Sequence, residues 1–198
     1  MMFIQKKKII LASNSPRRKD YLSRYKLDFK VKTGHLIEEP WQNESPSDFA
    51  ERMALEKNQA VHKIAKNDEI IISADTIVVF ENKIIGKPLN FENKMEMLSK
   101  LNGQTHEVIT AYVVFDVDNN EYLKNKSISK VSFNKVSNKF LNSYALSDES
   151  NDKAGSYSIQ GVGTFLVKSI EGSYNNVVGL PIEILLNDLI NHNFIEIA

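Results

Sequence analysis

The stretch Ile70–Phe80 constrains the fold more than any other part of the sequence. It is rich in isoleucine and valine, and it carries Asp75 and Thr76 near its centre. This length and composition are typical of a strand that is buried within a sheet. A carboxylate there must be paired, bind a metal or lie in a cleft, because a buried unpaired charge is costly. The alternative is an aspartate that backbone amides satisfy at a β-bulge. Asp75 is therefore the first candidate functional residue.

A second informative stretch follows the apolar run Ile9–Ala12, where a helix is predicted to begin. Ser15 stands at the N-cap position and Pro16 at the first helical position, and Arg17 and Arg18 follow in the first turn. A helix start carries partial positive charge and favours acidic side chains, so two arginines there indicate a bound anion such as a phosphate. The alternative is an ordinary, solvated helix start.

The remaining elements predict an α/β protein with a mixed sheet. Helices are predicted over Arg17–Tyr25, from Ser45 through Ala65, over Asn90–Lys100, from Ser137 through Leu146 and from Pro181 onward. Strands are predicted over Val108–Phe115, Tyr122–Phe133 and Thr164–Ile170, with hairpins among them. Hairpins that interrupt the alternation of strands and helices favour a mixed sheet over a purely parallel one. The polar connection Ser147–Gly163 is long enough to indicate a functional loop.

Composition narrows the classes of protein and partner. The chain has 198 residues with no internal repeat or linker, so a single domain over residues 1–198 is expected. The formal net charge is zero, which predicts no nucleic-acid or membrane partner and requires any anion site to be built locally. There are no cysteines, which excludes disulfides and thiolate metal sites. The first apolar run is too short for a signal peptide, and a cytoplasmic protein is expected.

Several common catalytic signatures are missing from the sequence. It has no phosphate-binding loop, no dinucleotide-binding glycine motif, no nucleophile elbow and no His-Glu-x-x-His pair. What remains is a set of cations and carboxylates on different predicted elements: Arg17, Arg18, Lys57 and Lys87, with Glu38, Glu39 and Asp75. Hard oxygen ligands of this kind suit Mg²⁺ or Mn²⁺ bound together with phosphates. Lys57 lies at the edge of an apolar helical face, where a snorkelling lysine is the alternative.

An ordered set of motifs resembles the Maf family of nucleoside triphosphate pyrophosphatases. The motifs run in the family's order from about residue 9 to residue 186. They are Ser13-Asn14-Ser15-Pro16-Arg17-Arg18, Ser73-Ala74-Asp75-Thr76, Gly86-Lys87-Pro88, Leu101-Asn102-Gly103-Gln104-Thr105-His106, Asp152-Lys153-Ala154-Gly155 with Ile159-Gln160-Gly161, and Asn176-Val177-Val178-Gly179-Leu180-Pro181. Asn14 and Ser158 stand where the family commonly has glycine.

The resemblance implies an elongated, twisted sheet flanked by helices, with a cleft between two lobes, as in ITPase-like proteins. It implies metal-dependent hydrolysis of dTTP and UTP to the monophosphate and pyrophosphate, with Mg²⁺ or Mn²⁺, by a homodimer. The roles it implies are catalysis for Asp75 and Lys87, substrate binding for Ser13, Arg17, Arg18, Lys57, Thr76 and Gln160, and metal binding for Glu39 and Asp75.

Two other functions are compatible with the same motifs. One is a pyrophosphatase for another non-standard nucleotide. The other is a nucleotide-binding regulator of cell division or septum formation that does not turn its ligand over. Because pure binding needs no general base, the presence of Asp75 together with Lys87 favours an enzyme.

Overall fold

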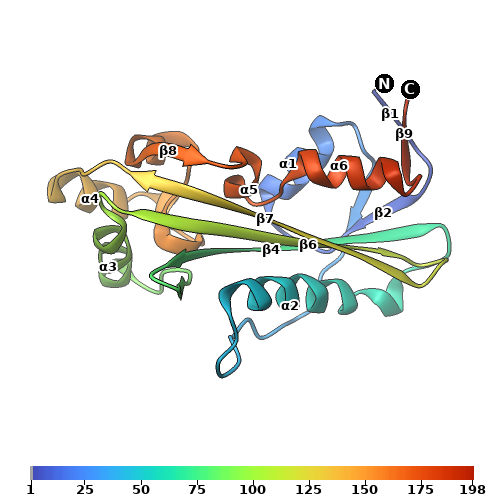
Figure 1. Ribbon diagram of the computed structural model, residues 1–198, viewed down its shortest axis with the longest axis horizontal. Helices are drawn as coiled ribbons and strands as arrows, with labels where there is room; N and C mark the ends of the chain where they lie inside the picture. Colours follow the sequence, from blue (N-terminus) through green and yellow to red (C-terminus); the bar gives the residue numbers. More distant parts are fainter. Residues whose placement is uncertain (1) are drawn as a thin grey trace. The chain divides into compact units, whose positions relative to one another are not determined.

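The computed structural model describes residues 2–198, and its main feature is a seven-stranded mixed sheet (Figure 1). The strand order is β3-β2-β4-β6-β7-β8, and β5 pairs with β4. The strands of this sheet are β2 (Lys8–Leu11), β3 (Phe29–Val31), β4 (Glu69–Phe80), β5 (Lys83–Ile85), β6 (Thr105–Asp116), β7 (Glu121–Phe133) and β8 (Val167–Glu171). Strand β2 pairs in parallel with β3 and β4, whereas the β4–β5 and β7–β8 pairs are antiparallel. The predicted α/β class with a mixed sheet is confirmed.

The chain divides into two compact units, and β4, β6 and β7 each contribute to both. Unit 1 is the chain up to Asp75 together with Thr110–Lys126 and Gly179–Ala198. Unit 2 is Thr76–Ile109 together with Ser127–Val178. Within residues 2–198, no helix is both long and apolar enough to cross a membrane.

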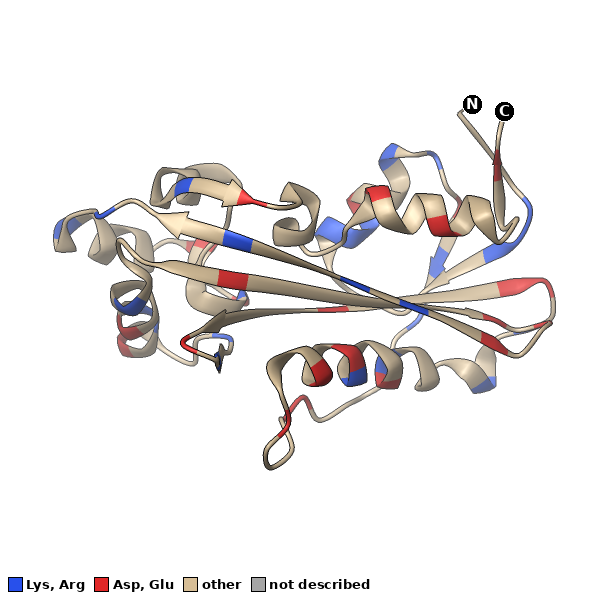
Figure 2. Ribbon diagram, in the orientation of Figure 1, with Lys and Arg blue, Asp and Glu red and all other residues tan. Residues whose placement is uncertain are grey.

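Unit 1 packs helices on both faces of its part of the sheet. Its helices are α1 (Pro16–Arg24), α2 (Pro46–Gln59) and α6 (Ile182–Asn191), and its short strands β1 (Phe3–Gln5) and β9 (Ile195–Ile197) pair antiparallel. Helix α2 lies on one face, and α1 and α6 lie on the other (Figure 1). The buried side chain of Asn58 donates to the Ile71 carbonyl at 2.9 Å, which fixes α2 against β4. Figure 2 shows basic residues on α1 and residues of both charges on α2.

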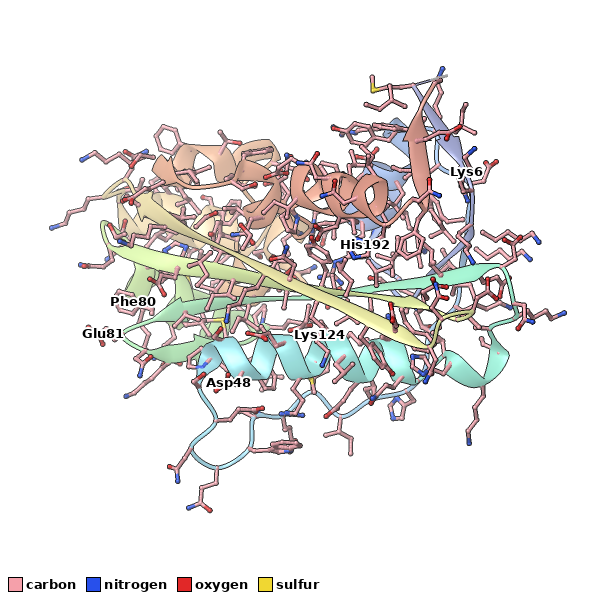
Figure 3. The ribbon with its side chains drawn as sticks, turned by 45° about the vertical axis from the view of Figure 1, so that its right-hand side comes forward. Lys6, Asp48, Phe80, Glu81, Lys124 and His192 are labelled. Carbon is pink, nitrogen blue, oxygen red and sulfur yellow. The ribbon has the colours of Figure 1, made fainter. Side chains whose placement is uncertain are left out.

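Helix α2 begins where the sequence predicts but ends earlier. The Ser45 hydroxyl accepts from the Asp48 N–H at 3.1 Å and donates to the Asp48 carboxylate at 2.7 Å. Figure 3 labels Asp48 at this end of the helix. The helix stops at Gln59, and a 3₁₀ turn, His62–Ile64, follows in place of the helix predicted through Ala65. The chain then enters β4 at Glu69, whose carboxylate accepts from the Lys66 N–H at 2.7 Å.

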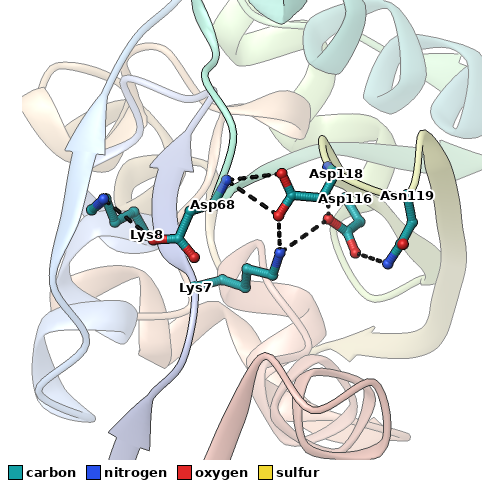
Figure 4. A network of polar contacts seen from close by, with 6 residues as sticks. All are labelled: Lys7, Lys8, Asp68, Asp116, Asp118 and Asn119. Carbon is teal, nitrogen blue, oxygen red and sulfur yellow. Dashed lines mark hydrogen bonds and ion pairs between the residues drawn. The ribbon is translucent and has the colours of Figure 1, made fainter.

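A polar network fixes the start of β4 to the β6–β7 turn (Figure 4). The Asp68 N–H donates to the Asp118 carboxylate at 3.0 Å. The Lys7 ammonium pairs with Asp118 and lies 3.7 Å from Asp116. The lysine offsets part of the charge of these carboxylates, and the cluster ties the start of β4 to the β6–β7 turn within unit 1.

Unit 2 has a core of its own. Its helices are α3 (Phe91–Leu101), α4 (Asn138–Ala145) and α5 (Tyr174–Val178), and its 3₁₀ turns are Asp148–Ser150, Ala154–Ser156 and Gly161–Leu166. Leu98, Leu101, Phe133, Leu141 and Leu166 are among the side chains buried together. The predicted strand from Thr164 starts only at Val167, because residues up to Leu166 form the last 3₁₀ turn.

A buried histidine in this core predicts a dependence of stability on pH. His106 is 2% exposed; its Nε2 lies 2.8 Å from the Tyr157 hydroxyl, and its Nδ1 has no hydrogen-bond partner among the described residues. Burial lowers the pKa of His106 to about 4. The unfolded chain therefore binds one more proton than the folded chain between pH about 6.5 and about 4. We expect the free energy of unfolding to fall by about 3 kcal/mol as the pH drops through that window.

Urea unfolding at a series of pH values measures this effect. The difference between wild type and His106→Gln isolates the histidine, and His35→Gln, an exposed site in unit 1, is the matched control. Equal pH dependence in wild type and His106→Gln would contradict the prediction.

Candidate active site

Asp75 lies on β4 at the edge of unit 1 and is paired with a lysine. The aspartate is 6% exposed, and its Oδ1 lies 2.5 Å from the Lys57 Nζ on α2. The same ammonium lies 2.8 Å from Glu38 Oε1. The partner of the buried carboxylate is thus a side-chain cation on a neighbouring helix, and β4 runs unbroken through this position. One ammonium therefore pairs with two carboxylates. A snorkelling lysine would instead extend its ammonium into solvent.

Arg18 is buried beside these charges. Its Nε donates to the Gly179 carbonyl at 2.9 Å and its Nη1 donates to the Ser13 hydroxyl at 3.1 Å. Burial lowers the pKa of Arg18, and the neighbouring charges of Asp75 and Glu38 oppose that shift. The arginine therefore lies within electrostatic reach of both carboxylates.

Arg17 adds a second, half-buried guanidinium at the same helix start. Burial lowers the pKa of Arg17, and its charge lowers the pKa of Arg18 further. Ser15 occupies the N-cap position but its side chain makes no capping hydrogen bond; instead, its N–H donates to Ser13 Oγ at 3.2 Å. The structure thus gathers Ser13 and both arginines around one turn, and the anion bound there stays a prediction.

The loop that carries Glu38 and Glu39 is fastened to α2 by Arg52. The guanidinium binds both oxygens of Glu44, at 2.6 and 2.7 Å, and donates to the Glu39 carbonyl at 2.9 Å. It also lies 3.9 Å from the centre of the Trp41 ring. The bidentate geometry makes this a strong anchor. From this loop, the Glu38 side chain pairs with the Lys57 ammonium, whereas Glu39 contacts Arg52 through its backbone carbonyl.

Unit 2 holds the other three residues predicted for the site. Thr76 is half-buried on β4, Lys87 is exposed after β5, and Gln160 is exposed after the buried Ile159. The Gly155 N–H donates to the Gly86 carbonyl at 3.0 Å, which brings the Lys87 turn to the Ala154–Ser156 turn. The chemical roles of these residues stay predictions.

Neither departure from the glycine pattern strains the backbone. Asn14 and Ser158 are both absent from the described residues with positive φ, so no left-handed conformation is required at either position. The Asn14 side chain donates to Thr33 Oγ1 at 3.2 Å, and Ser158 Oγ accepts from the Gln160 N–H at 3.1 Å. Both side chains add hydrogen bonds that glycine would lack.

Comparisons with known proteins match almost the whole chain. A family model described as Maf-like protein matches residues 8–192. A dTTP/UTP pyrophosphatase of Geobacter sulfurreducens is 40% identical over 187 residues, which are 94% of this chain and 97% of that protein. The dTTP/UTP pyrophosphatase of Pyrococcus furiosus is 42% identical over 181 residues, 91% of this chain and 93% of that one. Among solved structures, a nucleoside-triphosphatase / dITP/XTP pyrophosphatase of Mycobacterium abscessus is 15% identical, with a TM-score of 0.47 over 93% of this chain and 97% of that one.

Proposed function

The chain belongs to the Maf-like protein family, and on that premise we propose that it hydrolyses dTTP and UTP to the monophosphate and pyrophosphate. It is a nucleoside triphosphate pyrophosphatase. The observation that carries this proposal is the 40% identity to a dTTP/UTP pyrophosphatase over 97% of that protein's length. The charges around Asp75 support it, because three cations and two carboxylates are suited to a triphosphate with a metal ion.

In unit 1, the proposed roles are those that the family resemblance implies, and the charge and hydrogen-bonding capacity of the residues are compatible with them. Arg17, Arg18 and Lys57 neutralise the phosphates, and Ser13 supplies a polar contact. Asp75 accepts the proton of the attacking water while pyrophosphate leaves. The Lys57 ammonium, 2.5 Å from Asp75 Oδ1, holds this carboxylate in place.

In unit 2, three residues carry roles that the family resemblance implies. Lys87 contributes a catalytic positive charge. Thr76 and Gln160 contribute to the choice of base, since a glutamine amide offers both a donor and an acceptor to a pyrimidine.

A divalent metal fits the acidic residues of unit 1. Among the described residues, no group of three or more histidines, cysteines, aspartates and glutamates could hold a metal ion. However, the carboxylates of Asp75 and Glu38 are both paired with the Lys57 ammonium. Mg²⁺ is commonly held by one or two carboxylates together with substrate phosphates, so this donor set suits Mg²⁺ or Mn²⁺. We propose that Asp75 holds the metal with Glu38 or with Glu39 of the same loop; bound there, it would supply Lewis-acid stabilisation of phosphate charge.

A nucleotide panel tests the proposed function. The purified protein with Mg²⁺ is incubated with dTTP, UTP, dATP, dGTP and 7-methyl-GTP, and pyrophosphate and orthophosphate are measured separately. We expect pyrophosphate, with the highest kcat/KM for dTTP or UTP. A maximum on a purine nucleotide would favour the other pyrophosphatase specificity, and release of orthophosphate with a diphosphate would contradict the proposed bond. Nucleotides that raise the Tm without any turnover would favour the regulator.

The proposal extends to the state of the protein in the cell. The protein acts in the cytoplasm as a homodimer, with residues 1–198 as one enzymatic domain and with a role in nucleotide metabolism or septum formation. Light scattering after gel filtration tests the dimer, which a monomeric mass would contradict.

A further inference from the structure

The segment that carries Gln160 is held by hydrogen bonds on both sides, all within unit 2. On the N-terminal side, the Ser158 N–H donates to the Tyr144 hydroxyl at 3.0 Å. On the C-terminal side, the Thr164 hydroxyl donates to the Ile159 carbonyl at 2.9 Å. The backbone at Gln160 is thus fixed, although its side chain is exposed.

The strongest of these anchors is the carboxylate of Glu149. Its Oε1 accepts from the Val162 N–H at 2.9 Å, and its Oε2 accepts from the Gly163 N–H at 2.9 Å. These two N–H groups, followed by the charge of Lys153, hold the pKa of Glu149 below its usual range. Hydrogen bonds to an ionised acceptor are stronger than those between neutral groups.

The glycine next to Gln160 is required by this anchor. Gly161 has φ of 68°, in the left-handed region, and a Cβ built there would lie 2.2 Å from Glu149 Oε1. A side chain at position 161 would therefore displace the carboxylate. Gly161 thus leaves open the space that the Glu149 carboxylate fills.

We propose that Glu149 is a positioning residue for base selection: its carboxylate fixes the Gly161–Gly163 turn and thereby the direction in which Gln160 presents its amide. The inference rests on the proposed role of Gln160 in base choice. Both oxygens of the Glu149 carboxylate accept from backbone N–H groups. It acts through the backbone, so its removal changes discrimination between bases more than it changes the chemical step.

Glu149→Gln is the decisive variant because it keeps the shape and removes one acceptor. A glutamine can accept one of the two N–H groups, but its own amide N–H then faces the other donor. We expect KM for dTTP and UTP to rise about tenfold or more, with kcat within about twofold of wild type. The preference for dTTP over dATP should fall by a similar factor. In the background of Gln160→Ala, the same change should have little further effect on this preference.

Two additional measurements separate positioning from loss of folding and from failure of the proposed function. Amide hydrogen exchange should lose protection at Val162 and Gly163 in Glu149→Gln, with the unit 2 core unchanged. Asp148→Asn, an isosteric change in the same 3₁₀ turn, is the control and should alter neither readout. If wild type releases no pyrophosphate, the proposed function fails, and discrimination is then read from nucleotide-induced shifts in Tm.

Three outcomes would overturn the inference. The first is an unchanged preference between bases in Glu149→Gln. The second is an equal fall in kcat for all nucleotides at unchanged KM. The third is exchange protection at Val162 and Gly163 equal to that of wild type.

Discussion

Asp75→Asn is expected to lower kcat for pyrophosphate release by about 10²–10⁴-fold and to leave the fold intact. Asparagine keeps the size of the side chain and one acceptor oxygen, but it cannot accept the proton of the attacking water. The Lys57 ammonium would still be paired, because Glu38 lies 2.8 Å from it. We therefore expect the free energy of unfolding to stay within about 2 kcal/mol of wild type.

Single-turnover kinetics with dTTP, together with urea unfolding, measure the two parts of this prediction. Asp28→Asn is the matched control, since Asp28 is an exposed aspartate of the same unit and should keep full activity. Activity of Asp75→Asn within tenfold of wild type would exclude Asp75 as the general base. A large loss of stability would show that the carboxylate is mainly structural.

The two arginines at the start of α1 are expected to respond differently to replacement by lysine. Arg18 is buried, and its guanidinium donates hydrogen bonds to both the Gly179 carbonyl and the Ser13 hydroxyl. A lysine has a single nitrogen and cannot reproduce that fork, so Arg18→Lys should lower the free energy of unfolding by about 2–4 kcal/mol. Arg17 is only half-buried. Arg17→Lys should therefore change stability by less than about 1 kcal/mol.

Nucleotide affinity is expected to fall in both variants, since a lysine loses bidentate contact with phosphate. A saturating nucleotide at about 100 times its Kd should stabilise wild type by about 2.7 kcal/mol. The same nucleotide concentration should stabilise Arg17→Lys by clearly less. Thermal unfolding with and without nucleotide measures both effects, and Arg24→Lys at the other end of α1 is the control. Equal stabilisation of Arg17→Lys and wild type by nucleotide would contradict a phosphate role for Arg17.

Local signals in the sequence were sufficient for most elements. Proline after a capping residue marked the starts of α1 and α2, and the β-branched run marked β4, because these signals act over a few neighbouring residues. The short β1–β9 pair was missed, since its three-residue strands lie at opposite ends of the chain and neither has a local pattern. The C-terminal end of α2 and the start of β8 also differ from the prediction, because contacts beyond the local sequence decide where an element begins or ends.

The same distinction between local signals and distant contacts applies to the candidate site. The sequence by itself determined which residue types are present: the carboxylate within a buried strand, the arginines at a helix start, and the motif order of the Maf family. Only the tertiary structure decided the partners. It joined Lys57 to Asp75 and to Glu38, and it revealed Arg52 and Glu149 as anchors of two loops. Local propensity fixes backbone conformation over a few residues, whereas the pairing of distant charges depends on how β-strands and helices pack, which no local pattern encodes.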